Sequence, residues 1–379
     1  MSDTTMLPLD GLKVLDFSQF LAGPYCALKL ADMGAQVVKV ERAGMGDLSR
    51  YLYLTDTKIG GESTIFHAIN RNKRSVAVDL KSEADREKLW TLVRDADVVL
   101  QNFRPGVMER LGFGYEAVKA VNPGVVYGTV TGYGSDGPWV DLPGQDLLAQ
   151  ARSGVMWLSG GRDDGPVAMG LPIADVLAGA SLTQGVLALL YRRAVKGIGG
   201  RVETSLIEVL ADLQFELLTT WLNDGHRTPV RSANNPAHAY LAAPYGVYAT
   251  QDGHVAIAMG KLDLLARITG LDAELAGRDA FAERDAIKAG LAERLKTAPT
   301  AQWMAGFIEA DIWAAPVMDW EGLVDSGILR TLDMVQRVER GDVAMDTTKL
   351  PIRIDGTRPA SGRAAPELGD ANDLLDTGW

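Results

Sequence analysis

Residues 12–40 read LKVLDFSQFLAGPYCALKLADMGAQVVKV and contain a strand, a helix and a second strand in succession. The apolar run at 12–17 predicts a buried strand, and 37–40 predicts another. Between them, residues 25–33 have helical spacing, and Gly34 is typical of a helix C-terminus. Two strands joined by a helix within about 30 residues form a βαβ unit, whose strands are parallel.

The alternation of strands and helices continues along the first half of the chain. Each predicted strand is a short apolar run, and each predicted helix has apolar residues at helical spacing. The further predicted elements are strands at 75–78, 97–101 and 125–130 and helices at 82–94, 176–191 and 205–222. Strands separated by helices indicate an α/β fold with a mostly parallel sheet.

A chain of 379 residues is longer than one hydrophobic core usually supports, which predicts more than one domain. After the Asn-Asp-Gly at 223–225 the pattern changes to loop, then to strands near 245–259 and Ala-rich helices. We therefore expect a large domain at 1–224, a smaller α+β domain at 225–325, and a C-terminal segment at 326–379 that returns to the large domain.

The composition limits the kinds of partner. The formal net charge of −11 argues against nucleic acid, which binds clustered Lys and Arg. The single cysteine, Cys26, excludes an internal disulfide and favours a reducing compartment. Residues 1–14 lack the pattern of a signal peptide, and no uninterrupted apolar run reaches the ~18 residues of a membrane span. We expect a soluble cytoplasmic protein with no membrane partner.

Three common kinds of site have no motif in this sequence. The turn at 18–24 lacks the G-x-G-x-x-G that lets a backbone approach a pyrophosphate, and Pro24 removes an N–H donor, so we expect no nicotinamide or flavin cofactor. No G-x-S-x-G elbow of a serine hydrolase occurs. No zinc-binding spacing relates the four histidines, so no metal is expected; they are His67, His226, His238 and His254.

Basic residues gather near the predicted strand ends of the first domain. Loops that follow parallel strands meet at one edge of the sheet, where ligands bind, and Arg42 and Arg104 are placed there. The basic residues are Arg42, Arg71, Lys73, Arg74, Arg104 and Arg110. Two interpretations remain open for them, namely a solvated basic surface and a site that holds a polyphosphate through charge-assisted hydrogen bonds.

Asp175 stands before a long apolar helix and also has two interpretations. An Asp at this place is a common helix N-cap. A helix N-terminus also favours the ionised carboxylate, which keeps a nucleophile available at neutral pH. Glycines nearby let a substrate approach, and the N–H groups of Gly160 and Gly161 are candidate donors to an oxyanion.

Eight segments in a fixed order resemble one enzyme family. They are PLDGLKVLDFSQFLAGPYC (8–26), GAQVVKVERAGMGDLSR (34–50), NRNKRSVAVDLKS (70–82), DVVLQNFRPGVMERLGFGYE (97–116), NPGVVYGTVTGYGSDGP (122–138), GLPIADVLAG (170–179), GGRVETSLIEVL (199–210) and APELGDANDLL (365–375). The chain resembles the family III coenzyme A transferases, which include formyl-CoA transferase, carnitine CoA-transferase and alpha-methylacyl-CoA racemase.

This resemblance implies a Rossmann-like large domain, completed by the C-terminal segment, and a homodimer of two interlinked rings. It implies an acyl-CoA and a small carboxylic acid as substrates, with no permanently bound cofactor. Asp175 falls on the family's catalytic aspartate, which carries the acyl group and then coenzyme A during transfer. The positions that the resemblance assigns to coenzyme A contact are Leu21, Ala22, Arg42, Lys73, Asn102, Phe103, Arg104, Arg110 and Gln145.

Departures from the family pattern favour a transferase. Gln145 stands where racemases carry a histidine, and Lys261 is nearest to the racemase glutamate. Glutamine cannot exchange a proton near neutral pH, so racemisation by two bases loses one partner. Leu21 and the loop at 232–236 differ from formyl-CoA transferase, which argues against oxalate as the acceptor. A racemase-like isomerase and a non-catalytic coenzyme A binding protein remain the alternatives.

Overall fold

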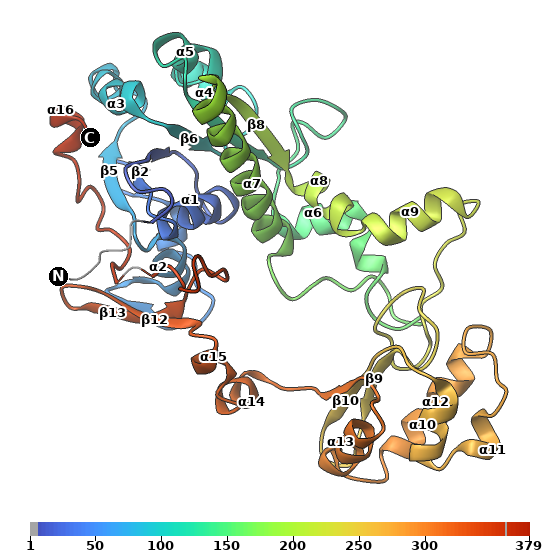
Figure 1. Ribbon diagram of the computed structural model, residues 1–379. Helices are drawn as coiled ribbons and strands as arrows, with labels where there is room; N and C mark the ends of the chain where they lie inside the picture. Colours follow the sequence, from blue (N-terminus) through green and yellow to red (C-terminus); the bar gives the residue numbers. More distant parts are fainter. Residues whose placement is uncertain (1–6, 361) are drawn as a thin grey trace. The chain divides into compact units, whose positions relative to one another are not determined.

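A computed structural model describes residues 7–360 and 362–379 (Figure 1). The chain divides into two compact units. Unit 1 contains the described residues up to 149 together with 172–210 and 328–379. Unit 2 contains 150–171 and 211–327. Each unit is thus built from segments that are distant in sequence.

A six-stranded parallel sheet forms the centre of unit 1 (Figure 1). Its strands are β1 (Lys13–Asp16), β2 (Gln36–Arg42), β5 (Arg74–Val78), β6 (Val98–Gln101), β7 (Val126–Thr131) and β8 (Gly200–Ser205). They lie side by side in the order β5-β2-β1-β6-β7-β8, and every neighbouring pair is parallel. Counted along the chain this is the 3-2-1-4-5-6 order of dinucleotide-binding folds, whose ligands bind where the order reverses, between β1 and β6.

The five predicted strands are confirmed, with ends within two residues of the expected ones. Strand β8 was not predicted, because its apolar and polar residues alternate over only six positions. It is an edge strand, and Arg201 and Glu203 are exposed on it. A strand with one solvent-exposed face lacks the continuous apolar run that is typical of the central strands.

Adjacent residues of the strands enter different cores, because side chains alternate across a sheet. Val14 packs in one core with helices α1 (Ala22–Asp32) and α7 (Ile173–Lys196). Leu15 packs in the other with α3 (Glu83–Asp95) and α16 (Leu374–Thr377). Both faces of the sheet are therefore covered by helices, which explains why its central strands are apolar throughout.

Helix α7 is a core helix of unit 1. Among the described residues it is the helix whose length and composition would suit a membrane span. However, it packs along α1, and its buried face includes Ala178, Leu182 and Val186. Gly179 is required at the contact, because a Cβ there would lie 2.5 Å from the carbonyl oxygen of Ala22. The helix ends at Gly197 in a left-handed conformation, as its sequence predicts.

The C-terminal segment lies along the edge strand β5 of unit 1. Ala371 donates its N–H to the Ser75 carbonyl oxygen at 2.9 Å, and Asp370 accepts the Ser75 N–H at 2.8 Å. Asn372 accepts the N–H of Ala77 at 2.7 Å. These bonds cover an edge that would otherwise expose unpaired backbone groups.

The remaining elements of unit 1 connect or flank the sheet. They are β3 (Lys58–Ile59), β4 (Glu62–Ser63), α2 (Thr64–Asn70), α4 (Val107–Leu111), α5 (Tyr115–Val121), α15 (Ile328–Thr331), β12 (Val335–Arg340) and β13 (Val343–Thr348). Helices α6 (Asp146–Ser153) and α8 (Leu206–Leu213) begin in unit 1.

Unit 2 has its own hydrophobic core between a small antiparallel sheet and several helices. The sheet has the order β11-β10-β9, and Tyr248, Val255 and Phe307 are buried beside it. Its elements are α9 (Phe215–Asn223), β9 (Gly246–Ala249), β10 (His254–Ile257), α10 (Leu262–Thr269), α11 (Asp272–Leu275), α12 (Arg284–Leu295), α13 (Thr300–Glu309), β11 (Ala314–Pro316) and α14 (Trp320–Asp325).

The prediction of one continuous helix over 205–222 is wrong. The helix is interrupted at Gln214, between α8 and α9. The Gln214 N–H bonds to the carbonyl oxygen three residues back, and its side-chain amide donates to the Ser153 carbonyl oxygen at 3.1 Å. This contact with a distant segment is invisible in local periodicity.

We predict that the two substitutions Gly179→Ala and Gly290→Ala change stability in opposite directions. In α7 the new methyl group meets a rigid carbonyl oxygen, and such overpacking costs about 1–3 kcal/mol. In α12 no atom lies within 4 Å of the new Cβ, and alanine in a helix is favoured by about 0.5–1 kcal/mol. Calorimetric unfolding of both variants tests this, and equal transition temperatures would contradict the close α1–α7 contact.

Candidate functional site

The loops after β1 and β6 meet at the carboxyl edge of the unit 1 sheet. The side-chain amide of Asn102 donates to the Gln19 carbonyl oxygen at 2.7 Å, and its oxygen accepts the Gln19 N–H at 2.8 Å. Asn102 therefore holds the two loops together at the point where strand order reverses, which is where ligands bind in such sheets. Phe103, the next residue, is half-buried.

Buried charged side chains stabilise the turn between β1 and α1. Lys39 donates to the Ser18 carbonyl oxygen and forms an ion pair with Asp47, each at 2.7 Å. Asp47 in turn accepts the N–H of Phe20, a non-glycine residue with a φ of 62°. Such a backbone conformation costs energy and persists only where surrounding contacts impose it. Leu21 follows as the residue before α1 and makes no side-chain capping bond.

Asp175 is the third residue of α7 and not its N-cap, because the cap position is Pro172. The N-cap interpretation is therefore wrong. Its N–H donates to Oδ2 of Asp146 at 3.0 Å. Burial raises the pKa of Asp175 to about 7, and the neighbouring Asp146 carboxylate acts in the same direction. This shift is opposite to the one that a helix N-terminus alone imposes.

Asp146 was not identified from the sequence, although Gln145 beside it was. It begins α6 and is 8% exposed. Gly132, directly after β7, and Gly144 bring this segment to the carboxyl edge, because a Cβ on either would lie 2.5 Å from the Cα of the other. Gln145 is exposed there. The local signal that was available is an Asp at a helix start, a position that favours carboxylates.

The α1–α7 contact also places Asp175 beside the first residues of α1. Gly179 lies against the Ala22 carbonyl oxygen and the ring of Tyr25. Asp175 precedes Gly179 by four residues and so lies on the same helix face, one turn nearer the N-terminus. The start of α1 at Ala22 therefore lies about one helical turn from Asp175 along α7.

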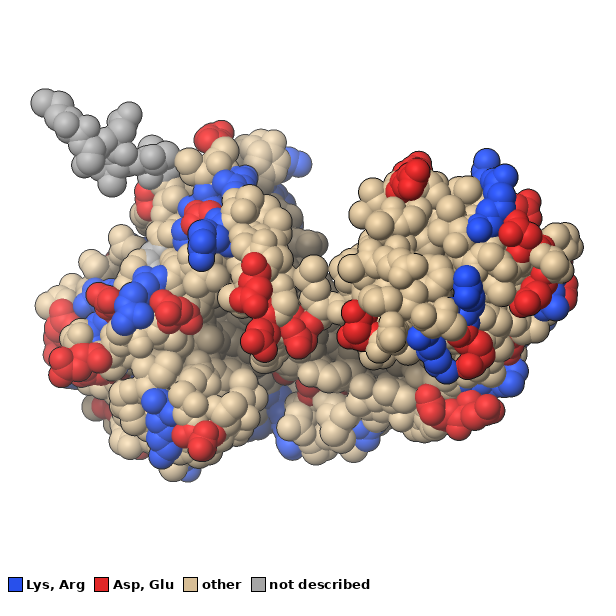
Figure 2. Space-filling model, turned by 90° about the horizontal axis from the view of Figure 1, so that it is seen from below, with Lys and Arg blue, Asp and Glu red and all other residues tan. Residues whose placement is uncertain are grey.

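Arg42, Arg104 and Arg110 are exposed in unit 1. Arg42 ends β2, Arg104 follows β6, and the guanidinium of Arg110 lies near Gly106. Within the part of the chain that the structure describes, none of the three pairs with a carboxylate in a salt bridge. On the face drawn in Figure 2, Lys and Arg side chains lie interspersed with Asp and Glu. Unpaired guanidinium groups near a ligand edge suit phosphate groups.

Lys73, in contrast, is buried and already has three partners. Its ammonium donates to Asp16 at 3.1 Å, to the Pro24 carbonyl oxygen at 2.9 Å and to Asn70 at 3.0 Å. Burial lowers the pKa of Lys73 to about 8, although Asp16 opposes the shift. In the structure Lys73 stabilises the first turn of α1 through its bond to Pro24. Its contact with coenzyme A stays a prediction.

Two other members of the predicted basic cluster are also paired. Arg71 forms a buried ion pair with Asp32, and Arg74 lies 3.6 Å from Asp373.

Glu41, the acid at the end of the first βαβ unit, is also engaged. Arg50 donates to both of its carboxylate oxygens, at 2.8 and 2.7 Å, and Ser75 donates at 2.7 Å. Burial acts to raise the pKa of Glu41, but Arg50, Lys39 and Ser75 together outweigh it and the net pKa is lowered. Glu41 has the position of the carboxylate that binds a ribose in dinucleotide-binding folds, but here it forms an ion pair with Arg50 inside the protein.

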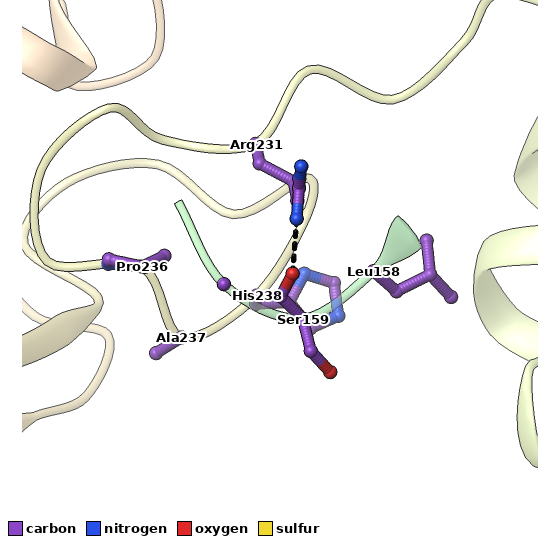
Figure 3. Close-up of a pocket in the computed structure, with 7 residues that line it drawn as sticks. Leu158, Ser159, Arg231, Pro236, Ala237 and His238 are labelled. Atoms are coloured by element: carbon purple, nitrogen blue, oxygen red, sulfur yellow. Dashed lines mark hydrogen bonds between the residues drawn. The ribbon is translucent and has the colours of Figure 1, made fainter. Parts of the chain in front are cut away.

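Unit 2 contains a cavity of about 240 Å³ (Figure 3). The guanidinium of Arg231 points at the Ser159 carbonyl oxygen, and it also donates to Asp164 at 2.6 Å and Gly165 at 3.2 Å. These carbonyl oxygens satisfy its donors, so Arg231 orders the loop. The N–H of Gly161 donates to the Asp164 carboxylate at 2.6 Å, which argues against it as an oxyanion donor. Among the described residues no cluster of acidic, His or Cys side chains suits a metal ion.

A sequence model described as CoA-transferase family III matches residues 9–372. The chain belongs to this family. A relative from Acetobacter aceti, acetyl-CoA:oxalate CoA-transferase, is 33% identical over 381 residues, which cover 97% of this chain and 95% of that one. Succinyl-CoA:mesaconate CoA-transferase from Haloarcula marismortui is also 33% identical, over 97% and 96%. The chain is therefore a CoA-transferase, which confirms the resemblance.

The solved structures agree with this assignment. A CaiB/BaiF family protein from Brucella suis superposes with a TM-score of 0.84 at 29% identity, over 98% of this chain and 99% of that one. The predicted α/β fold with a parallel central sheet is confirmed.

We predict that Lys73→Met and Arg104→Gln separate stability from coenzyme A binding. The first leaves Asp16 buried without its cation, which costs about 3–5 kcal/mol of unfolding free energy. The second removes an exposed charge, so stability changes by about 0.5 kcal/mol or less while coenzyme A affinity falls about tenfold. Denaturant unfolding and titration calorimetry with coenzyme A measure both. Loss of affinity without loss of stability in Lys73→Met would assign Lys73 to the ligand.

Proposed function

We propose that this CoA-transferase moves coenzyme A between carboxylic acids through covalent intermediates on Asp175. The observation that carries the proposal is the carboxylate at the start of α7, half-buried beside the first turn of α1, with a pKa raised to about 7. At neutral pH such a group is ionised in a large fraction of molecules. It is also more basic, and hence more nucleophilic, than an ordinary aspartate.

The transfer is a double displacement. An oxygen of Asp175 attacks the donor thioester carbonyl, the C–S bond breaks, and the electron pair leaves on the coenzyme A thiolate. The product on the enzyme is an aspartyl–acyl anhydride. The thiolate then attacks the aspartyl carbonyl, which forms an enzyme thioester and releases the donor acid as a carboxylate. The acceptor carboxylate reverses both steps and regenerates Asp175.

The surrounding residues support these steps. Arg42, Arg104 and Arg110 carry the charges that bind the coenzyme A phosphates. Ala22 packs against Gly179, four residues after the proposed nucleophile, and the thioester would sit at this end of the two helices. Exclusion of water protects the anhydride from hydrolysis. Gln145 cannot exchange a proton, which disfavours the racemase-like alternative.

The identity of the acceptor acid is part of this proposal and does not follow from the family to which the chain belongs. The relatives named above act on oxalate and on mesaconate, as their names state, and both are small dicarboxylates. These names support small carboxylic acids as substrates, so oxalate is included among the acids to be tested, although the difference at Leu21 argues against oxalate.

The dimer of interlinked rings and the cytoplasmic location are likewise proposals. Light scattering tests the dimer, which should have twice the mass of one chain.

We predict that Asp175→Ala abolishes exchange between acyl-CoA donors and carboxylic acids while the protein stays folded and binds coenzyme A. The reason is that no other group replaces the nucleophile. Mass spectrometry of thioester products measures exchange, and Asp141→Asn, an exposed carboxylate of the same unit, is the control. Hydroxylamine added with acyl-CoA should convert Asp175 to a hydroxamate. Transfer by the Ala variant, or a hydroxamate elsewhere, would refute the covalent role.

We further predict opposite pH dependences for activity and stability. Because Asp175 must be ionised to attack, kcat/KM falls about tenfold per pH unit below about pH 7. A carboxyl group whose pKa is higher in the folded state binds its proton more tightly there, so its contribution to stability is lost as pH rises from about 4 to 7. Asp175→Asn therefore unfolds at a higher temperature than the wild type at pH 8, and this difference is smaller at pH 5. Equal differences at both pH values would show that Asp175 titrates normally.

A further inference from the structure

Phe20 has a backbone conformation that its side chain disfavours. It lies in the turn between β1 and α1 with a φ of 62°, in the left-handed region, where a Cβ is costly and a bulky residue is an outlier. The other non-glycine residues with positive φ in the described part of the chain are of types that tolerate this region better. They are Asn72, His226, Asn235, Asp311, Asp333 and Asp355.

Burial of the Phe20 ring does not offset this strain. The side chain is 44% exposed, and it belongs to neither of the two hydrophobic cores described for unit 1. Glycine or asparagine would form the same turn at a lower cost. A side chain that is both strained and exposed contributes little to folding, and such strain is typical of functional sites.

Bonds to two other loops hold Phe20 in this conformation. Asp47, in the loop after β2, accepts the Phe20 N–H at 3.3 Å and is itself fixed by its ion pair with Lys39. Asn102, in the loop after β6, bonds both backbone groups of Gln19. The turn therefore cannot relax without losing these bonds, and the position of the exposed ring is fixed.

Phe20 is close to other exposed apolar residues at the carboxyl edge of the sheet. Because Asp47 bonds Phe20, the loop that follows β2 lies against the turn. Leu48 directly follows Asp47, and Tyr51 donates its hydroxyl to the Met45 carbonyl oxygen at 2.9 Å, which closes the loop. We call Phe20, Met45, Leu48 and Tyr51 the apolar patch, and all four are exposed.

The apolar patch adjoins the place where the proposed function puts the acyl group. Phe20 precedes Ala22, the first residue of α1, by two positions. Ala22 packs against Gly179 of α7, and the thioester would sit at this end of the two helices. The chain of atoms beyond the thioester carbonyl is therefore the part of the substrate that can cover the apolar patch.

The charges of this region favour an apolar acyl chain over one that ends in a second carboxylate. Lys39 is buried and paired with Asp47, and Arg50 is buried and donates to both oxygens of Glu41. Arg42 is exposed, but the proposed function assigns it to the coenzyme A phosphates. A carboxylate on the apolar patch would lose water without gaining a partner, whereas an alkyl or aryl chain gains by burial there.

We propose that the apolar patch binds the acyl chain of the donor, so that the preferred acyl-CoA carries an alkyl or aryl group without a second carboxylate. This inference rests on the proposed function and adds the class of acyl group to it. Phe20 is then a specificity-determining residue. Its ring contacts the chain equally before and during transfer, so its loss raises KM and leaves kcat unchanged.

The kinetic test compares hexanoyl-CoA with succinyl-CoA, using one acceptor acid throughout. Phe20→Asn removes the ring and introduces a residue that tolerates positive φ, so the fold is retained. For this variant kcat/KM for hexanoyl-CoA should fall about tenfold through KM, and kcat/KM for succinyl-CoA should change less than about twofold. Phe20→Leu keeps an apolar side chain and should lose only about threefold with hexanoyl-CoA. Tyr191→Ala, which removes an exposed aromatic ring near the other end of α7, is the matched control and should behave like the wild type.

The binding test uses Asp175→Ala, in which no transfer is expected. By titration calorimetry, hexanoyl-CoA should bind this variant about tenfold more tightly than succinyl-CoA does. Adding Phe20→Asn should abolish the difference, while the affinity for coenzyme A itself changes less than about twofold. Equal binding of the two thioesters by Asp175→Ala would overturn the inference, and so would an equal loss of both thioesters on adding Phe20→Asn.

Two further results separate this inference from its alternatives. If Phe20→Asn halves the mass measured by light scattering and keeps the preference for hexanoyl-CoA, the apolar patch contacts a second copy of the chain and the inference is wrong. If Asp175→Ala transfers coenzyme A, the proposed covalent function fails, but the difference in binding between the two thioesters still supports the acyl site. If Asp175→Ala is inactive and binds both thioesters equally, only the inference about the apolar patch fails.

Discussion

The contact between α1 and α7 at Gly179 is the constraint on which the site depends. A hydrogen atom in place of a side chain lets α7 approach the Ala22 carbonyl oxygen directly. That approach aligns the starts of both helices at the carboxyl edge of the sheet, where the strand order reverses. Asp175, on the first turn of α7, is then one turn away from the contact with the start of α1. The position of Asp175 is thus set by packing of the core.

Buried charges perform a different task from exposed ones in unit 1. Lys39 and Lys73 have no exposed surface and bind carbonyl oxygens and carboxylates within the protein. They hold the turn after β1 in a conformation that costs energy. Arg42 and Arg104 are exposed at the same edge. The basic residues of unit 1 therefore include both buried groups that stabilise the fold and exposed groups that are candidates for binding a ligand.

Local sequence patterns predicted most strands of the large sheet, but they did not identify the contacts that form the candidate site. Central strands are apolar throughout and could be predicted from short runs, whereas the edge strand β8 alternates and was missed. The role of Asp175 came from resemblance, since its local context also fits a helix cap. Asp146 and the burial of Lys73 depend on partners 29 and 57 residues away, which no local periodicity contains.

The segment at 370–372 completes the sheet at β5, although it follows Ser75 by 295 residues. During synthesis, the backbone groups of that strand stay open until residues 370–372 have left the ribosome. An open strand edge pairs readily with other chains. The nascent protein therefore exposes this strand edge while the 295 residues from 76 to 370 are made, and the edge is covered only after that.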